Sequence, residues 1–468
     1  MSEYVARQGR PIAIVGVACR LPGAPNVRAF WEVLSEARDT LARTPSVHRP
    51  LPCGDELSPG GLLDDIDGFD AKFFGVSPHE AVRIDPQHRL LVETVWEALE
   101  DAGLPADRLA GSQTGVYTSC FTGQYWNLLQ GAGLRDAHAM AGAHHAAVPA
   151  GRIAHLLDLR GPTIDVGAAC ASSLVAVHLA CQAIWSGEVS TALVGGVNLL
   201  LFNDRTGLAD AGLISPTRRC QFGDEGADGY VPAEGAVAVV LKPLDDALEA
   251  GDRIYATILA SGMSNGGRQA SVCATGATGL EDLLRRVIRD AGIAPADVDY
   301  VEAHGTGTPH GDAVELAALG RVLGAGRVAD QRCLVGSVKS NIGHTEAAAG
   351  LAGLVKTALA LHHRTVPATL HVHRPNPVLR TDGAALELSR ATRPWPERGR
   401  RGFAGVTSLG MFGIGAHLVL AEGPRPAGHL PRGERPARAM LLPLSAKDPA
   451  ALAALASAYA DAVTAAPD

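Results

Sequence analysis

The stretch Thr163-Ile-Asp-Val-Gly-Ala-Ala-Cys-Ala-Ser-Ser-Leu174 joins a strand-like run to a helix through a turn of small residues. The strand-like part is 163–167. The helical part is 172–185, where apolar residues recur at helical spacing and predict an amphipathic helix. Cys170 therefore lies between a strand and the first turn of a helix. A strand followed by a turn and a helix is the repeating unit of layered α/β proteins, so this stretch predicts an α/β fold.

The same alternation of strands and helices extends along most of the chain. Short β-rich runs that read as covered on both faces alternate with helical segments. The predicted strands are 12–17, 114–119, 192–197, 236–241, 253–261, 300–304 and 335–339, and the further helices are 86–103 and 279–292. The second half repeats the alternation of strands and helices seen in the first, and the boundary between the halves lies near Gly251. We therefore expect two architecturally similar halves.

Three regions are expected from length and composition. A chain of 468 residues is too long for one ordinary core. We expect a first half at 10–252 and a second half at 253–422. Residues 423–468 form a linker rich in proline and glycine over 423–436, followed by a short alanine-rich helix at 449–466.

Composition excludes several classes of protein. A net charge of −8 argues against a nucleic-acid-binding protein, which would carry a basic surface. Eight cysteines are scattered without a Cys-x-x-Cys pair, which fits neither a disulfide framework nor a zinc ribbon. The chain shows neither a signal peptide nor an uninterrupted apolar run of membrane-spanning length. We therefore expect a cytoplasmic protein that binds no membrane.

Cys170 is the candidate nucleophile. A cysteine beside a helix N-terminus feels the positive end of the helix dipole, which favours the thiolate. Its alanine neighbours leave room for an acyl chain. The other seven cysteines are expected to be structural: Cys19, Cys53, Cys120, Cys181, Cys220, Cys273 and Cys333.

Two histidines follow strand-like runs and sit beside glycines. They lie in His304-Gly-Thr-Gly-Thr308 and Lys339-Ser-Asn-Ile-Gly-His344. The glycines allow the backbone to approach a ligand, and the Thr306 and Thr308 hydroxyls can hold an amide-rich arm. A histidine at a helix N-terminus, as expected for His344, is biased towards neutral imidazole. One cysteine with two such imidazoles suits thioester chemistry, in which the cysteine is acylated and the imidazoles handle a carbon nucleophile.

A metal site is not expected, although the chain has 17 histidines. His362 and His363 are adjacent in sequence and point apart in a helix. His371 and His373 share a strand face but lack two further obvious ligands.

Taken together, these motifs resemble the β-ketoacyl synthase (ketosynthase) domain of modular type I polyketide synthases, in the thiolase superfamily. The resemblance runs from about residue 11 to 422. It includes the three motifs above and the segments Ile14-Val-Gly-Val-Ala-Cys-Arg-Leu-Pro-Gly23, Phe69-Asp-Ala-Lys-Phe-Phe-Gly-Val-Ser-Pro78, Asp85-Pro-Gln-His-Arg-Leu90 and Ala227-Asp-Gly-Tyr230.

The resemblance implies a thiolase-like five-layer αβαβα fold, a homodimer, and an acyltransferase of polyketide biosynthesis, including antibiotic biosynthesis. Cys170 would take an acyl chain from a carrier thioester. His304 and His344 would assist decarboxylation of a malonyl-type unit and stabilise its enolate. The backbone N–H groups of Cys170 and Met411 would form the oxyanion hole.

The resemblance also implies the partner and the supporting residues. The substrates would be carried on the 4'-phosphopantetheine of an acyl carrier protein, with no bound metal or redox cofactor. Thr306 and Thr308 would bind the pantetheine arm, and Lys339 and Asn341 would support the histidines.

Several positions depart from the family pattern. Gly167 stands where the family usually has Asp, and Pro232 stands where it usually has Arg. The segments Cys220-Gln-Phe-Gly-Asp224 and Met411-Phe-Gly-Ile-Gly-Ala-His417 also depart from it. The positions expected to alter the acyl pocket or its gating loop are Phe222, Gly223, Phe412 and Ile414.

These departures leave alternatives to chain elongation. An atypical ketosynthase would acylate Cys170 and then promote aldol or lactone closure of the bound chain. A carrier-binding module would only pass chains along, but such modules often lack the first histidine, and His304 is present here. A papain-like protease would leave the second histidine without a role.

Overall fold

The computed structural model describes residues 9–41, 60–121, 123–144, 148–202, 206–268, 276–328, 331–382, 384–424 and 441–465. Cys53, Cys273 and most of the predicted linker at 423–436 lie outside these residues. The chain divides into two compact units. The larger falls within Met1–Phe69 and His79–Gly423, and the smaller within Asp70–Pro78 and Pro424–Asp468. The smaller unit contains the predicted C-terminal helix, α16 (Pro449–Ala465).

Eleven strands of the larger unit form one mixed sheet in the order β10-β8-β7-β12-β13-β6-β1-β5-β4-β2-β3. The strands are β1 (Ile12–Arg20), β2 (Gly115–Cys120), β3 (Thr163–Asp165), β4 (Ala192–Asn198), β5 (Gly235–Pro243), β6 (Ala256–Asn265), β7 (Tyr300–Glu302), β8 (Cys333–Gly336), β10 (Leu386–Leu388), β12 (Phe403–Leu409) and β13 (Ile414–Glu422). A second, two-stranded sheet pairs β9 (Thr365–Val366) with β11 (Arg393–Pro394).

The large sheet is built from two copies of one topology. In the first half, β2 lies parallel between β3 and β4, and β5 is antiparallel to β4 and β1. In the second half, β7 lies parallel between β8 and β12, and β13 is antiparallel to β12 and β6. The halves join where Ile12–Ile14 of β1 pairs with Ala256–Ile258 of β6. The expectation of two similar halves is confirmed.

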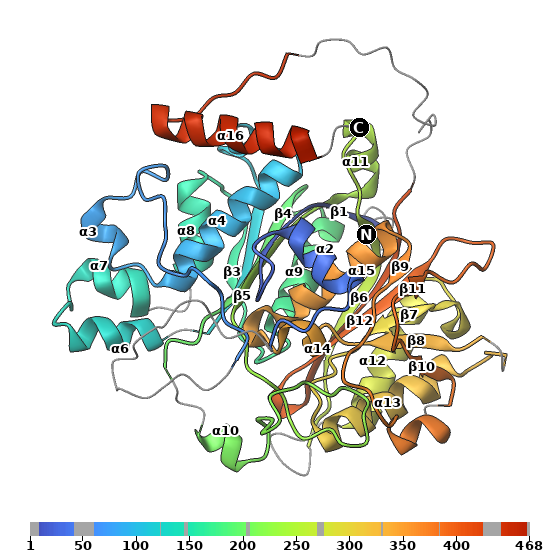
Figure 1. The fold of residues 1–468 in the computed structure, drawn as a ribbon. Helices are drawn as coiled ribbons and strands as arrows, with labels where there is room; N and C mark the ends of the chain where they lie inside the picture. The colour runs from blue at the N-terminus through green and yellow to red at the C-terminus, as the bar shows by residue number, and fades with distance from the viewer. Residues whose placement is uncertain are drawn as a thin grey trace. The chain divides into compact units, whose positions relative to one another are not determined.

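Helices cover both halves of the sheet (Figure 1). Helices α9 (Ser172–Ser186) and α15 (Ala349–His362) pack against each other and contact strands of both halves. Helices α4 (Pro86–Asp101) and α8 (Val148–Leu156) contact strands of the first half. Helices α12 (Ala277–Asp290) and α13 (Pro309–Leu323) contact strands of the second half. With the two halves of the one sheet supplying its two β layers, the fold is the thiolase-like αβαβα arrangement that the resemblance implied.

The central helices are buried on nearly every side. The prediction that 172–185 is amphipathic is wrong, because α15 and the strands of both halves cover α9. Gly350 allows the close approach, since a Cβ there would lie 2.8 Å from the Leu174 Cβ. Within the described ranges, one helical stretch, Ala169–Ser186, is long and apolar enough to span a membrane, but 67% of it is buried. Such burial is typical of the core helix of a globular domain.

Shorter elements complete the described structure. They are α2 (Val27–Ser35), α3 (Pro78–Ala81), α5 (Ala106–Leu109), α6 (Gln124–Gly131), α7 (Ala137–Ala139), η1 (Met140–His144), α10 (Thr206–Asp210), α11 (Leu244–Ala250), η2 (Pro295–Asp297), α14 (Lys339–Ile342), η3 (Glu346–Ala348), η4 (Pro377–Arg380) and η5 (Met411–Gly413). The strand predicted at 335–339 is displaced along the chain, because β8 spans Cys333–Gly336 and Lys339 already begins α14. His304 likewise follows β7 and does not belong to it.

Candidate active site

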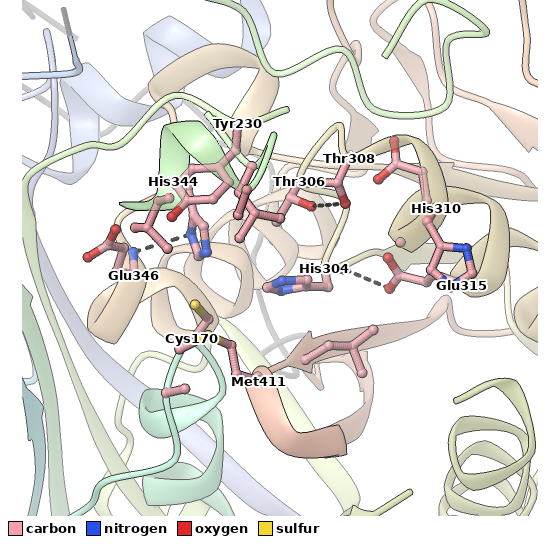
Figure 2. Close-up of a pocket in the computed structure, with 18 of the residues that line it drawn as sticks. Cys170, Tyr230, His304, Thr306, Thr308, His310, Glu315, His344, Glu346 and Met411 are labelled. Carbon is pink, nitrogen blue, oxygen red and sulfur yellow. Dashed lines mark hydrogen bonds between the residues drawn. The ribbon is translucent and has the colours of Figure 1, made fainter. Parts of the chain in front are cut away.

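One cavity of about 550 Å³ brings together Cys170, His304 and His344, which are far apart in sequence. Figure 2 shows the three side chains pointing toward one another, each from a different turn. The imidazole centroids of His304 and His344 lie 5.5 Å apart, with the rings nearly perpendicular at 82°. The lining also includes Phe121, Leu208, Leu213, Tyr230, Thr306, Thr308, His310, Asp312, Glu315, Glu346, Leu409 and Met411.

Cys170 sits in a constrained turn between β3 and α9. The residue before it, Ala169, has a left-handed φ of 49°, a conformation that costs energy for any residue with a side chain. Cys170 precedes the N-cap residue Ala171, so it lies directly before the first turn of α9, as the sequence predicted. Its carbonyl oxygen accepts a hydrogen bond from the Ser408 hydroxyl at 2.9 Å. These contacts hold the thiol at the cavity wall.

The hydrogen bonds of His344 select one tautomer of its ring. Its Nδ1 accepts a hydrogen bond from the backbone N–H of Glu346 at 3.2 Å, so Nδ1 carries no proton. The proton of the neutral ring therefore lies on Nε2. The Tyr230 ring stacks edge-on against the imidazole, with centroids 5.0 Å apart. His344 can thus donate a hydrogen bond from Nε2, which supports the expectation of a neutral imidazole.

The backbone of His304 is fixed by a hydrogen bond from Lys339. Its carbonyl oxygen accepts a hydrogen bond from the Lys339 ammonium group at 2.5 Å. Burial, reinforced by the positive charge of Lys339, lowers the pKa of His304 well below its ordinary value. Its buried Nδ1 finds no hydrogen-bond partner among the described residues. We therefore infer that both histidine side chains are uncharged at neutral pH.

Two buried carboxyl groups on α13 fix the loop that carries His304. Both oxygens of Glu315 accept backbone N–H groups, from His304 at 2.8 Å and from Gly305 at 2.9 Å. Asp312 accepts from Gly307 at 3.1 Å and from Gly223 at 3.0 Å. Burial raises the pKa of Glu315 to about 7, although its hydrogen bonds oppose the shift.

The same burial raises the pKa of Asp312 to about 8. It also lowers the pKa of the neighbouring Lys339. Sequence reasoning missed Asp312 and Glu315, although their spacing of three residues directly after the His304 motif places them on one face of a helix.

The predicted supporting residues divide into two groups. Thr306 and Thr308 line the cavity, with their hydroxyl oxygens 3.1 Å apart, and Met411 lines the opposite wall (Figure 2). Lys339 contacts the backbone carbonyl of His304 through its ammonium group. Asn341 is fully buried away from the cavity, where its amide donates to the Arg38 carbonyl at 3.1 Å.

The four residues predicted to shape or gate the pocket do not line the cavity. Phe222 is buried under the His304 loop, where a Cβ on Gly305 would lie 2.8 Å from its ring. Gly223 has a left-handed φ of 75° and packs against Leu388. Phe412 also has a left-handed φ of 63° and is 59% exposed. Ile414 begins β13 and packs against the core.

Other side chains shape the cavity wall, and sequence reasoning gave them no role. Leu409 and Phe121 supply apolar surface, and Tyr230 contacts a catalytic candidate directly. A single sequence carried no signal for Leu409, which ends β12, or for Phe121, which follows β2, because the tertiary fold brings them to the cavity.

The histidines weighed as metal ligands lie outside this cavity. His362 and His363 place their ring centroids 5.1 Å apart at nearly a right angle, and the His371 Nε2 faces Asp39 at 3.3 Å. Across the described ranges, no group of three or more His, Cys, Asp and Glu side chains has a metal-binding arrangement.

Family models match most of the chain. The β-ketoacyl synthase N-terminal domain matches residues 9–247, and the C-terminal domain matches residues 255–373. The chain is 41% identical over 473 residues to a phenolphthiocerol/phthiocerol polyketide synthase protein of Mycobacterium tuberculosis. That alignment covers 96% of this chain and 21% of the relative. A second protein of the same synthase is 42% identical over 88% of this chain and 23% of its own length. The chain thus spans about a fifth of these relatives.

Solved structures agree with the family models. The ketosynthase from module 6 of the bacillaene synthase of Bacillus subtilis 168 is 39% identical, with a TM-score of 0.86. That match covers 98% of this chain and 78% of the other. An oxazolomycin ketosynthase domain of Streptomyces albus JA3453 is 35% identical, with a TM-score of 0.87, over 97% and 81% of the two chains. From the family models, the relatives and the site together, the chain belongs to the β-ketoacyl synthase family and is a ketosynthase of the polyketide synthase type.

Proposed function

We propose that this ketosynthase takes an acyl chain from a carrier thioester onto Cys170 and extends it by decarboxylative condensation with a malonyl-type carrier thioester. The observation that carries the proposal is the convergence of Cys170, His304 and His344 on one cavity, with both imidazoles neutral. A neutral imidazole carries no charge itself, and its N–H group can donate a hydrogen bond to a developing oxyanion.

The first step is transfer of the acyl group. The Cys170 sulfur attacks the carbonyl carbon of the pantetheine thioester, a new carbon–sulfur bond forms, and the pantetheine thiol leaves with the proton of Cys170. Thr306 and Thr308 line the approach to the sulfur and offer hydroxyls to the amides of a pantetheine arm. The apolar side chains of Phe121, Leu213 and others surround the space left for the acyl chain.

The second step forms the carbon–carbon bond. The malonyl unit loses carbon dioxide, and the electron pair of the broken bond forms an enolate whose oxygen accepts hydrogen bonds from His304 and His344. The enolate carbon attacks the acyl carbon on Cys170, and the Cys170 sulfur leaves and takes up one proton from solvent. The products are a 3-oxoacyl carrier thioester, carbon dioxide and the free thiol.

Product masses test the proposal. The protein is incubated with a simple acyl thioester, with and without a malonyl-loaded carrier, and the intact masses of both proteins are followed beside a Cys170→Ala control. Elongation predicts a 3-oxoacyl carrier that requires both malonyl carrier and Cys170. A cyclised product formed without malonyl carrier would support ring closure instead. A carrier with a free pantetheine thiol is tested in the same way, because a malonyl-loaded thiol cannot accept an acyl group. Transfer of the unchanged acyl group to that free thiol, without carbon dioxide, would indicate a chain-passing module.

A further inference from the structure

A second cleft, of about 560 Å³, lies at the β10 edge of the sheet, outside the cavity described above. Its floor is apolar and includes the buried Leu386 and Leu388. Four arginines surround this floor against a single acidic side chain, Glu387. They are Arg332, Arg380, Arg390 and Arg393, and together with the floor they define the arginine cleft.

Most of this positive charge is unpaired. Arg393 pairs with Glu387 at 2.6 Å, yet its buried Nε finds no acceptor among the described residues. Arg332, Arg380 and Arg390 are exposed, and their side chains make no ion pair or hydrogen bond within the described part of the chain. Unpaired guanidinium groups around an apolar floor favour a ligand that presents carboxylates beside apolar side chains.

The charge of this region contrasts with that of the whole protein. Residues 253–422 carry 18 Lys and Arg against 14 Asp and Glu, whereas the entire chain carries 41 against 49. Surface arginines in an acidic protein have many nearby carboxylates with which to pair. A cleft that gathers four of them around one acid therefore indicates a binding surface for an acidic partner.

A short chain of contacts connects the arginine cleft to the wall of the active-site cavity. Leu388 of its floor is the nearest neighbour of Gly223, whose N–H donates to Asp312. Asp312 in turn lines the cavity, as does Thr308, which caps α13. Helix α13 also packs on β10 and on η4, which ends at Arg380. Figure 1 shows α13 and β10 together at one end of the sheet. A partner seated in the cleft would therefore contact β10 and the end of η4, which pack on the helix that carries Asp312 into the cavity wall.

We propose that the arginine cleft docks an acidic, apolar-faced segment of the carrier domain that exchanges acyl chains with Cys170. The identity of the partner rests on the proposed function, and the sign of its charge follows from the cleft. The apolar floor holds the segment in place, and the arginines steer its approach and set its orientation. Carrier recognition is thereby separated from the chemistry in the cavity.

Binding and acylation together test this proposal. Affinity is measured by titrating polyketide synthase carrier domains, bearing acetylated pantetheine, into the full chain and into Arg380→Glu with Arg390→Glu. The matched control is Arg108→Glu, which reverses an exposed arginine on α5 that has no side-chain partner among the described residues. Acylation of Cys170 is measured in parallel with a small acetyl thioester that has no carrier.

We expect the double variant to weaken carrier binding by about tenfold at low salt, because rim charges govern encounter between oppositely charged surfaces. The loss should shrink as salt rises, and acylation by the small thioester should stay at the wild-type rate. Arg108→Glu should bind as the wild type does. Unchanged carrier affinity in the double variant, or no binding of any tested carrier by the wild type, would overturn the proposal. Carrier binding that depends on these arginines without acylation of Cys170 would support docking and refute the proposed function instead.

Discussion

At the scale of single residues, the site separates the proposed nucleophile from the two imidazoles proposed to stabilise the enolate. Cys170 lies in a strained turn, whereas His304 and His344 are neutral rings held by backbone contacts. In the proposed first step, acylation of the Cys170 thiol does not require a proton from the His304 or His344 imidazole. Acylation and decarboxylation should therefore respond differently to substitution.

Replacing either histidine by alanine should leave acylation of Cys170 largely intact and slow decarboxylation by about 10²–10³-fold, the usual cost of losing one oxyanion donor. Rapid-quench mass spectrometry measures the two rates separately. His310→Ala is the matched control, because His310 also lines the cavity but is exposed at its entrance. Equal loss of acylation and decarboxylation in the His344 variant would contradict the assigned roles.

The three reactive candidates could be found from the sequence because each lies in a short motif with its own backbone signals. Glycines beside His304 and His344 and small residues around Cys170 mark turns that approach a ligand. Asp312 and Glu315 could not be assigned in the same way. Two acidic residues on a helix usually indicate a solvated face, and their burial is decided by the loop that folds over them.

At the scale of elements, the loop after β12 fixes the position of Met411 relative to Cys170. A Cβ at Gly410 would lie 2.6 Å from the Ala168 carbonyl oxygen, so Gly410→Ala must displace the turn. We expect the kcat/KM for acylation to fall by about 10- to 100-fold, since small displacements of catalytic groups have such effects. Gly167→Ala is the control, because a Cβ there meets nothing within 4 Å. A wild-type rate in Gly410→Ala would show that this turn does not position the reacting groups.

The buried carboxyls of α13 predict a pH dependence of stability. The pKa of Glu315 is raised to about 7 and that of Asp312 to about 8, whereas carboxyls in the unfolded chain titrate near pH 4. Between about pH 4 and pH 8 the folded chain therefore binds more protons than the unfolded chain. The free energy of unfolding contributed by these groups should fall as pH rises through that window.

Urea unfolding from pH 5 to pH 8 measures this slope. Glu315→Gln cannot ionise and should show a shallower decline through pH 7 than the wild type. Glu249→Gln changes an exposed carboxyl and should leave the slope unchanged. An identical slope in Glu315→Gln would mean that Glu315 binds no extra proton in the folded state.

The bounds of strands and helices were predicted most accurately where the sequence pattern within the element itself defines it. The strands at β1, β2, β4 and β5 and the helix α4 begin and end within three residues of the predicted bounds. Helix α9 was predicted to be amphipathic from the spacing of its apolar residues. That spacing does not reveal that a second central helix, α15, covers α9, because α15 lies far along the chain.

At the scale of the whole molecule, the pseudo-repeat explains why the reactive residues converge. Cys170 follows β3 and precedes α9, and His344 follows β8 and precedes α15, so the two residues occupy equivalent places in the two halves. The packing of α9 against α15 brings these equivalent turns together. The topology itself came from the family resemblance, because no clean sequence repeat reveals it.

The homodimer implied by the resemblance stays a prediction, and one feature of the sheet supports it. Among the described strands, β3 forms one edge of the large sheet and pairs with β2 alone, and Ile164 on it is 40% exposed. An uncovered edge strand is a surface for pairing with a second copy. Light scattering after size exclusion should give a dimer for the wild type and a monomer for Ile164→Lys. Val328→Lys, at another exposed apolar position, should remain dimeric. A monomeric wild type at micromolar concentration would contradict the prediction.

In the proposed function, acylation of Cys170 and loss of carbon dioxide belong to one carbon–carbon bond-forming cycle. A single-turnover experiment can show whether the two steps are coupled. The protein is first acylated on Cys170 and freed of excess thioester, and malonyl-loaded carrier is then added. We predict that one acyl group leaves Cys170 for each carbon dioxide released and each 3-oxoacyl carrier formed. Loss of the acyl group without carbon dioxide, or release of carbon dioxide while the acyl group stays on Cys170, would contradict the account.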